Sequence, residues 1–259
     1  RRVLFRSGRF GKAKTSAEKS SVMRSARSAV LASDLDERIP GLAINRFCAS
    51  GLSAVQMAAD RIRVGEADVM IAAGVESMSM VPMMGNGPSL SPAMFANDEN
   101  VGIAYGMGLT AEKVAQQWKV SRDAQDEFAC QSHMKAIAAM KAGDFAAEIT
   151  PVEVTDRAPD LQSGTSVATT RTVNLDEGPR PDTTLEALAK LKPVFDRSAA
   201  GTITAGNASA LTDGASLVCL MAEDEARRQG RPILGFVNDV EFSAINPQDG
   251  LLMAPGVAL

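Results

Sequence analysis

The feature of the sequence that most constrains the fold is an alternation of apolar segments between residues 42 and 73. Leu42–Phe47 is a short apolar run, and Val69–Ala73 is a second one. Between them, apolar residues recur at helical spacing, at Leu52, Val55, Ala58, Ala59 and Ile62. Strand, helix and strand within about 30 residues form a βαβ unit. The pattern therefore predicts an α/β fold around a parallel sheet that is buried on both faces.

The segment after this unit changes character. Prolines and glycines at 77–108 predict an irregular loop. Two helices are expected next, at 110–118 with Thr110 as the N-cap candidate, and at 121–143 with Ser121 as the cap.

The sheet pattern returns late in the chain. Residues 150–193 are polar and loop-rich apart from a helix at 185–191, which indicates an insertion on the sheet domain. Strands are expected again at 215–221 and 233–240, with a short helix at 223–229 between them.

Composition excludes several classes of protein. With 259 residues, of which 45% are hydrophobic and 22% charged, the chain is typical of a globular protein with one large domain or two small ones. A net charge of −4 argues against nucleic-acid binding. No apolar run approaches the ~18 residues of a membrane span. Three scattered cysteines favour a reducing compartment, so we predict a cytoplasmic location and no metal site, since His133 is the single histidine.

Both ends of the chain are unusual. Residues 1–20 are basic, lack an initial methionine and suggest either a transit peptide or an artefactual leader; we favour the leader and exclude it from the fold. The other end stops at Met253–Leu259 without a polar tail. We therefore expect the chain to be a fragment.

Cys48 is the main candidate for chemistry. It follows a predicted strand and precedes a predicted helix, where the positive end of the helix dipole favours a thiolate. The same turn could offer backbone N–H groups to an oxyanion. A free cysteine is also commonly a small buried apolar residue, and position alone leaves the two interpretations about even. Cys130 and Cys219 have no such context and are expected to be structural.

Two other features carry weaker signals. Gly201–Ser209 combines glycines, hydroxyls and amides, and could line a ligand site, although alone it is an ordinary glycine-rich loop. His133 lies roughly 140° round its helix from Phe128, away from the expected core face. Periodicity alone therefore favours a solvated surface histidine.

Four ordered segments resemble the thiolases, acyltransferases that cleave or form 3-ketoacyl-CoA. The segments are Ile44–Ala54, Gly74–Met80, Gly108–Ala115 with Ser121–Asp126, and Gly201–Ser209. The resemblance extends from about Val22 to the C-terminus. The segment at 80–99 and the triplet Gln131–His133 are more similar to degradative 3-ketoacyl-CoA thiolases than to the biosynthetic type.

The resemblance implies a thiolase-like, layered α/β sheet domain with an inserted loop domain, and a second, C-terminal half that is mostly absent. On this basis, 1–20 is a non-family leader and 21–80 with 200–230 forms the N-terminal sheet domain. Residues 81–199 then form the loop domain that binds coenzyme A, and 231–259 begins the C-terminal domain.

The resemblance also implies roles for individual residues. Cys48 is the nucleophile that takes the acyl group as a thioester. Coenzyme A, a substrate with no separate cofactor, is bound by family positions that this chain occupies with His133, Met134, Arg180, Ala205 and Ser209. Acyl-CoA and CoA are the expected partners, and the full-length form is expected to be a homodimer or homotetramer.

The chain departs from the family in its catalytic groups. The family's Gly-His-Pro base, its C-terminal cysteine and its Asn-Glu-Ala-Phe motif do not occur in this sequence. An ordinary thiol, with a pKa of about 8.5, is only a few per cent thiolate at pH 7. We therefore predict that the chain alone is catalytically very weak. The alternatives are a non-catalytic CoA- or lipid-binding module on a thiolase scaffold, and another condensing enzyme of the same fold.

Overall fold

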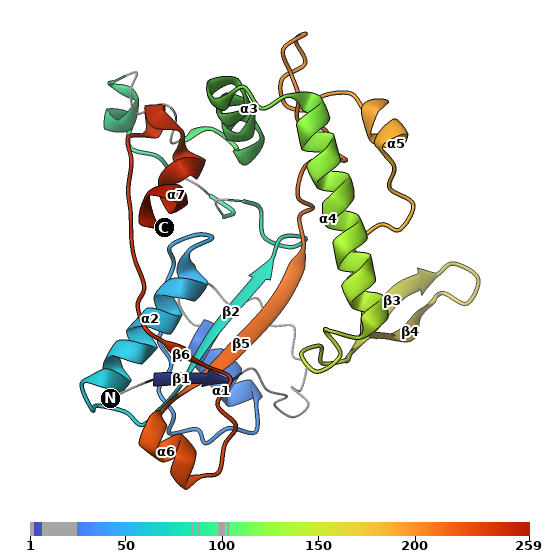
Figure 1. Cartoon of the computed structure of the whole chain (residues 1–259). Coiled ribbons are helices and arrows are strands. Elements are labelled where there is room, and N and C mark those ends of the chain that lie inside the picture. Colours follow the sequence, from blue (N-terminus) through green and yellow to red (C-terminus); the bar gives the residue numbers. More distant parts are fainter. Residues whose placement is uncertain (1–2, 7–24, 84, 88, 98–101, 103) are drawn as a thin grey trace. The chain divides into compact units, whose positions relative to one another are not determined.

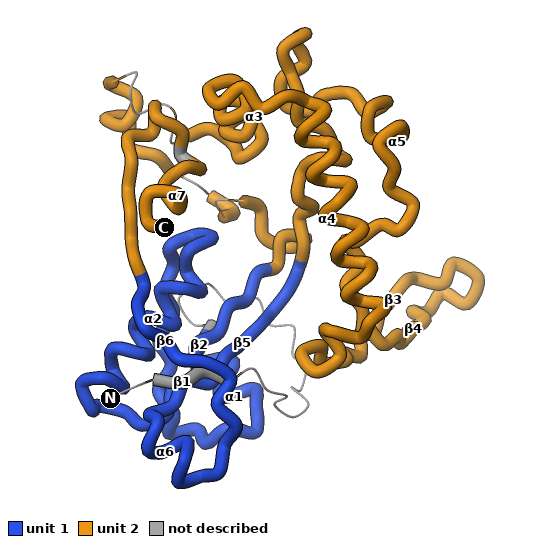
Figure 2. The backbone as a smooth tube through the Cα atoms, viewed as in Figure 1, with its two compact units in different colours: residues 1–76, 213–240 blue, residues 77–212, 241–259 orange. Residues whose placement is uncertain are grey.

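A computed structural model describes residues 3–6, 25–83, 85–87, 89–97, 102 and 104–259. The chain divides into two compact units, shown in different colours in Figure 2. Unit 1 comprises residues 1–76 and 213–240, and unit 2 comprises 77–212 and 241–259.

Unit 1 contains a four-stranded sheet in the order β2-β5-β1-β6 (Figure 1). Its strands are β1 (Val3–Arg6), β2 (Val69–Ser77), β5 (Asp213–Ala222) and β6 (Gly235–Val237). Its helices are α1 (Ser25–Ala32), α2 (Ser50–Arg63) and α6 (Glu223–Arg228).

The core of unit 1 lies between α2 and the sheet. Ala58, Ala59 and Ile62 of α2 are buried against apolar residues of β2 and β5, among them Ala72 and Leu220. Val55, Ala58, Ala59 and Ile62 of the helical spacing recognised in the sequence are therefore on the face that packs on the sheet, whereas Leu52 is 66% exposed. Small alanines on this face allow the helix and the strands to approach closely.

The predicted strand at 42–47 does not form. Leu42 and Phe47 are 70% and 74% exposed, and the segment contains only an isolated bridge between Arg46 and Cys48. The side chain of Asn45 accepts a hydrogen bond from the backbone N–H of Phe47, at 2.9 Å. A side chain that binds the backbone in this way competes with strand pairing.

The prediction of a parallel sheet is also wrong for β1 and its two neighbours. β1 is antiparallel both to β5, with Val3 opposite Ala222, and to β6, with Val3 opposite Val237. Residues 3–6, which we excluded from the fold, therefore lie between two other strands of the sheet. The expected strand at 233–240 is shortened to β6.

Unit 2 is built on two helices, α3 (Met107–Trp118) and α4 (Arg122–Ala142). Ser121 caps α4 as predicted, since its hydroxyl accepts from Ala124 N–H at 3.2 Å, and Gly143 ends the helix with a φ of 79°. Thr110 is not a cap. It lies inside α3, which begins after Gly106.

The remaining elements of unit 2 are short or exposed. They are the strands β3 (Val152–Asp160) and β4 (Thr165–Val173), the helices α5 (Leu185–Ala189) and α7 (Ala254–Ala258), and 3-10 turns at Pro92–Phe95, Pro247–Asp249 and Leu251–Met253. The β3–β4 hairpin, in which nine residue pairs face one another, was not predicted from the sequence. Its strands are almost wholly exposed, so they lack the apolar alternation that identifies a half-buried strand.

The segment expected to be irregular at 77–108 contains a short 3-10 turn at Pro92–Phe95, and α3 begins within it at Met107; Pro88 lies outside the described residues. Within the described part of the chain, no helix is both long enough and apolar enough to cross a membrane. The units divide after residues 76 and 212, whereas the sequence placed the domain limits near 80 and 200.

Replacing Ile62 by alanine tests the packing of α2. The side chain is fully buried, so Ile62→Ala removes apolar contacts and leaves a cavity, and we expect the free energy of unfolding to fall by about 2–5 kcal/mol. Urea unfolding measures the change. Val64→Ala is the matched control, because Val64 is 71% exposed and should change stability by less than about 0.5 kcal/mol. Equal losses in both variants would contradict the packing described.

Candidate active site

Cys48 lies on an exposed turn immediately before α2. Its thiol is free, and Ala49 is the N-cap residue of the helix. The preceding residue, Phe47, has a φ of 49°, a conformation that bulky residues rarely adopt. Such outliers persist only where the surrounding contacts hold them, and they concentrate at functional sites. Exposure also decides against the buried apolar role for Cys48.

Hydrogen bonds from Asn45 and Ser50 hold this turn. Besides the bond from Phe47 N–H to Asn45 Oδ1, the Ser50 hydroxyl accepts from Arg46 N–H at 2.7 Å and donates to the Phe47 carbonyl at 2.7 Å. A Cβ added to Gly51 would meet no atom within 4 Å. Side-chain hydrogen bonds therefore hold the turn, and the Cβ position of Gly51 faces open space.

Two of the backbone N–H groups proposed for an oxyanion are already used. Ala49 N–H donates to the Arg46 carbonyl at 3.2 Å, and Ser50 N–H donates to the Phe47 carbonyl at 3.0 Å. These bonds form the turn itself. Any oxyanion donor here must therefore come from other groups or from a rearranged turn.

The other predicted site residues all lie in unit 2, and two of them are in direct contact. Nδ1 of His133, on α4, accepts a hydrogen bond from the backbone N–H of Arg180 at 3.1 Å. His133 is half-buried, so the expectation of a solvated surface histidine is wrong. The acceptor role of Nδ1 leaves its Nε2 as the N–H donor of the neutral ring. Met134 is the next residue on α4 and is 39% exposed.

The guanidinium of Arg180 contacts Asp182 at 3.3 Å. This hydrogen bond is the main cause that lowers the pKa of the Asp182 carboxyl below its usual range. Both side chains are 70% exposed, and exposed ion pairs contribute little free energy. The guanidinium is therefore available to exchange Asp182 for another anion at small cost.

Residues 201–209 form a loop that is closed by its own side chains. Thr204 N–H donates to Asn207 Oδ1 at 2.7 Å, and the Thr204 hydroxyl accepts from the N–H groups of Gly206 and Asn207. Ala205 and Ser209 are exposed on this loop. A Cβ on Gly206 would lie 2.5 Å from the side chains of Leu188 and Leu191, so a larger residue here would require these leucine side chains to shift.

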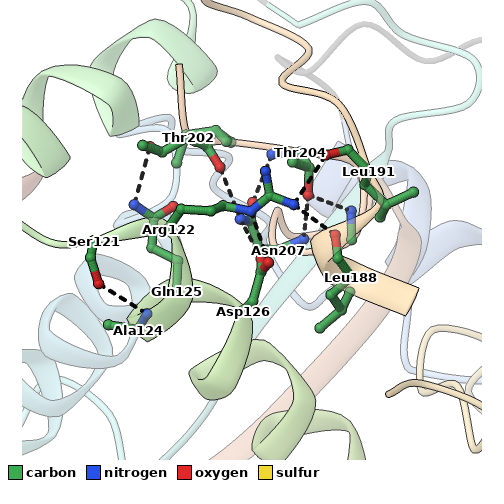
Figure 3. Close-up of polar contacts among 12 residues, drawn as sticks. Ser121, Arg122, Ala124, Gln125, Asp126, Leu188, Leu191, Thr202, Thr204 and Asn207 are labelled. Atoms are coloured by element: carbon green, nitrogen blue, oxygen red, sulfur yellow. Dashed lines mark hydrogen bonds and ion pairs between the residues drawn. The ribbon is translucent and has the colours of Figure 1, made fainter. Parts of the chain in front are cut away.

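The loop is fixed to α4 through Asp126 (Figure 3). One oxygen of this buried carboxylate accepts from Asn207 Nδ2 at 2.9 Å, and the other accepts from Arg122 Nε at 2.8 Å. The same Arg122 donates to the carbonyls of Leu188 and Leu191, which ties α5 to α4 as well.

Glu112 on α3 holds the other end of the loop. Its carboxylate is only 3% exposed, and it accepts from the N–H groups of Thr202 and Ile203 and from the Thr202 hydroxyl, at 2.8–3.0 Å. Gln125 of α4 donates to the Thr202 hydroxyl at 3.1 Å. Glu112, Arg122, Asp126 and Asn207 received no individual role from the sequence, although all four lie inside segments quoted for the family resemblance.

The chain is therefore an α/β protein that presents an exposed cysteine at the start of a helix and in which the sequence of a second unit is inserted between two strands of the first. Its similarity to known proteins identifies its family. The family described as "Thiolase, N-terminal domain" matches residues 10–224, so the chain belongs to the thiolase family. The match begins within the segment 1–20 that we expected to lie outside the family.

Individual relatives agree with this assignment. "Acetyl-CoA acetyltransferase" of Pseudomonas aeruginosa is 37% identical over 232 residues, which cover 86% of this chain and 56% of the relative. The human "3-ketoacyl-CoA thiolase, peroxisomal" is 38% identical and is covered to 53%. The chain spans about half the length of the curated relatives it matches.

Solved structures match over a similar share. The dimeric peroxisomal thiolase of Saccharomyces cerevisiae has a TM-score of 0.72 and 38% identity, with 86% of this chain and 53% of that chain covered. Human mitochondrial 3-ketoacyl-CoA thiolase has a TM-score of 0.70 and 31% identity, with 91% and 61% covered. The thiolase-like α/β fold predicted from the sequence is thereby confirmed.

Replacing Ser50 by alanine tests the turn around Cys48. Ser50→Ala removes the hydrogen bonds to Arg46 and Phe47, and we expect it to lower the free energy of unfolding by about 1 kcal/mol. Ser166→Ala, on the exposed strand β4, should leave stability unchanged. Urea unfolding compares the two variants. A Ser50→Ala protein as stable as the unaltered chain would show that the hydroxyl does not hold the turn.

Proposed function

We propose that the chain carries the nucleophile and much of the coenzyme A pocket of a thiolase-type acyl-CoA:CoA acyltransferase. The observation that carries the proposal is the free, exposed Cys48 at the start of α2, next to a residue with positive φ. Membership of the thiolase family supports it, because the curated relatives are named acetyl-CoA acetyltransferases and 3-ketoacyl-CoA thiolases.

The proposed reaction has two half-reactions. In the first, the Cys48 thiolate attacks the 3-keto carbonyl carbon of a 3-ketoacyl-CoA, the bond between C2 and C3 breaks, and protonation of C2 releases acetyl-CoA. The acyl group remains on Cys48 as a thioester. In the second, the thiol of another CoA takes the acyl group and returns the proton to Cys48. Run in reverse, the same steps form a carbon–carbon bond.

Unit 2 is the proposed binding site for coenzyme A. His133 and Arg180 are joined by a hydrogen bond, so the imidazole and the guanidinium are presented by one local structure. Arg180 can exchange its exposed partner Asp182 for a phosphate, since planar guanidinium groups bind phosphate through paired hydrogen bonds. Met134, Ala205 and Ser209 are exposed and complete the proposed set.

The proposed chemistry lacks a base in this chain. His133 is the single histidine, and its Nδ1 is engaged by Arg180 N–H in the binding unit. We therefore propose that the 259-residue chain acylates Cys48 slowly and turns over very weakly. Assembly as a homodimer or homotetramer belongs to the proposed full-length form. The cytoplasmic location stays a prediction, since relatives carry peroxisomal and mitochondrial names.

Intact-protein mass spectrometry tests acyl transfer to Cys48. Incubation with acetyl-CoA at neutral pH should add one acetyl group slowly, with release of CoA, and the adduct should be absent in Cys48→Ser. Cys130→Ser and Cys219→Ser are the matched controls and should retain the adduct, because both cysteines are partly buried.

The outcomes of this experiment separate the alternatives. A folded chain that binds CoA and forms no adduct favours the non-catalytic binding module. Rapid acylation with sustained thiolysis of acetoacetyl-CoA would contradict the proposed weakness of the chain. An adduct that persists in Cys48→Ser would assign the chemistry to another residue.

Binding of coenzyme A is tested at Arg180. Arg180→Ala removes the guanidinium and keeps the backbone N–H that binds His133, so we expect the Kd for CoA to rise about tenfold. Arg171→Ala is the control, because Arg171 is an exposed arginine on β4 that also forms ion pairs. Isothermal titration measures both. An equal loss in the two variants would indicate a general effect of positive charge.

A further inference from the structure

Two buried carboxylates hold the loop 201–209, and neither belongs to the predicted site. Glu112 on α3 is 3% exposed and Asp126 on α4 is 4% exposed. Burying a carboxylate costs free energy unless hydrogen bonds compensate for its lost hydration. Such a pair is therefore retained only where its hydrogen bonds are well formed.

Every oxygen of these carboxylates is aimed at a donor that fixes the loop or its support. Oε1 of Glu112 accepts from Thr202 and Ile203 N–H groups, and Oε2 accepts from Thr202 N–H and its hydroxyl. Oδ1 of Asp126 accepts from Asn207. The loop is thus bound at its start by α3 and at its centre by α4, on either side of Ala205.

Asp126 also couples the loop to a second segment. Its other oxygen orients Arg122, which donates to two carbonyls of the α5 region at 2.6 and 3.1 Å. Leu188 and Leu191 of that region lie against Gly206. The position of Gly206 relative to α5 therefore depends on the same carboxylate that binds Asn207.

We propose that Glu112 and Asp126 are positioning residues for coenzyme A, acting through the loop that presents Ala205 and Ser209. This inference rests on the proposed function of that loop. Neither carboxylate touches the ligand. They fix the backbone of 202–207, and displacement of a binding group by about 1 Å is enough to cost up to about a hundredfold in activity.

Amide replacements test this role with little change of shape. In Glu112→Gln, either orientation of the amide places an NH₂ group against a backbone N–H, because both oxygens accept from backbone donors. In Asp126→Asn, the NH₂ group faces either Arg122 or Asn207, and Asn207 cannot turn because its own oxygen accepts from Thr204. Both variants should loosen the loop.

The experiment uses the 259-residue chain and CoA itself. We expect Glu112→Gln and Asp126→Asn to raise the Kd for CoA at least about tenfold, while the exposed carboxylate variant Asp156→Asn leaves it unchanged. Hydrogen exchange of the amides of 202–207 should accelerate in the two variants, while the amides of α2 keep their protection. The acetyl-CoA concentration that half-saturates Cys48 acylation should rise while the limiting rate is retained.

A second variant covers the case in which an amide replacement does not fold. Thr202→Val keeps the shape of the side chain and removes only the hydroxyl that binds Glu112 and Gln125, so it should weaken CoA binding in the same direction. If the variants fold and their loop is loosened but the Kd for CoA is unchanged, the positioning role is overturned and the proposed function is unaffected. Failure of the unaltered chain to bind CoA would overturn the proposed function, and this inference with it.

Discussion

The hydrogen bonds of two buried carboxylates, Glu112 and Asp126, are the interactions on which unit 2 depends. A carboxylate without partners in an apolar interior costs several kcal/mol, so each group is stable there only while its donors are in place. The donors come from the loop 201–209 and from Arg122. The helices α3 and α4, the loop 201–209 and α5 therefore stabilise one another, because removal of the loop or of Arg122 leaves a buried carboxylate without its donors.

The turn at Cys48 depends on the same kind of interaction at smaller scale. Side chains of Asn45 and Ser50 take backbone groups that would otherwise pair in a strand. The outcome is an irregular segment with Phe47 at positive φ and a thiol exposed beside a helix start. In unit 1 and in the loop 201–209, predicted site residues lie on irregular backbone that nearby polar side chains hold, whereas His133 and Met134 lie within the regular helix α4.

The family assignment and the single histidine are the basis of the chemistry proposed for this chain. The sequence matches the N-terminal domain of thiolases and spans about half of its curated relatives. His133 accepts a hydrogen bond from Arg180, an arrangement suited to binding. We therefore propose that unit 1 supplies the nucleophile and unit 2 the contacts with coenzyme A, because Cys48 lies in unit 1 and His133 and Arg180 lie in unit 2.

The sequence by itself determined the family, the helix α2, the helix α4 with its Ser121 cap, the strands β2 and β5, and Cys48 as the candidate nucleophile. These follow from local periodicity, capping and motif order, which neighbouring residues specify. Only the tertiary structure decided that 42–47 is no strand, that Val3–Arg6 pairs within the sheet, and that Glu112 and Asp126 hold the loop 201–209. Strand pairing and the burial of charge depend on distant partners, such as Val237 opposite Val3, and no local pattern records which distant donor satisfies a given carboxylate.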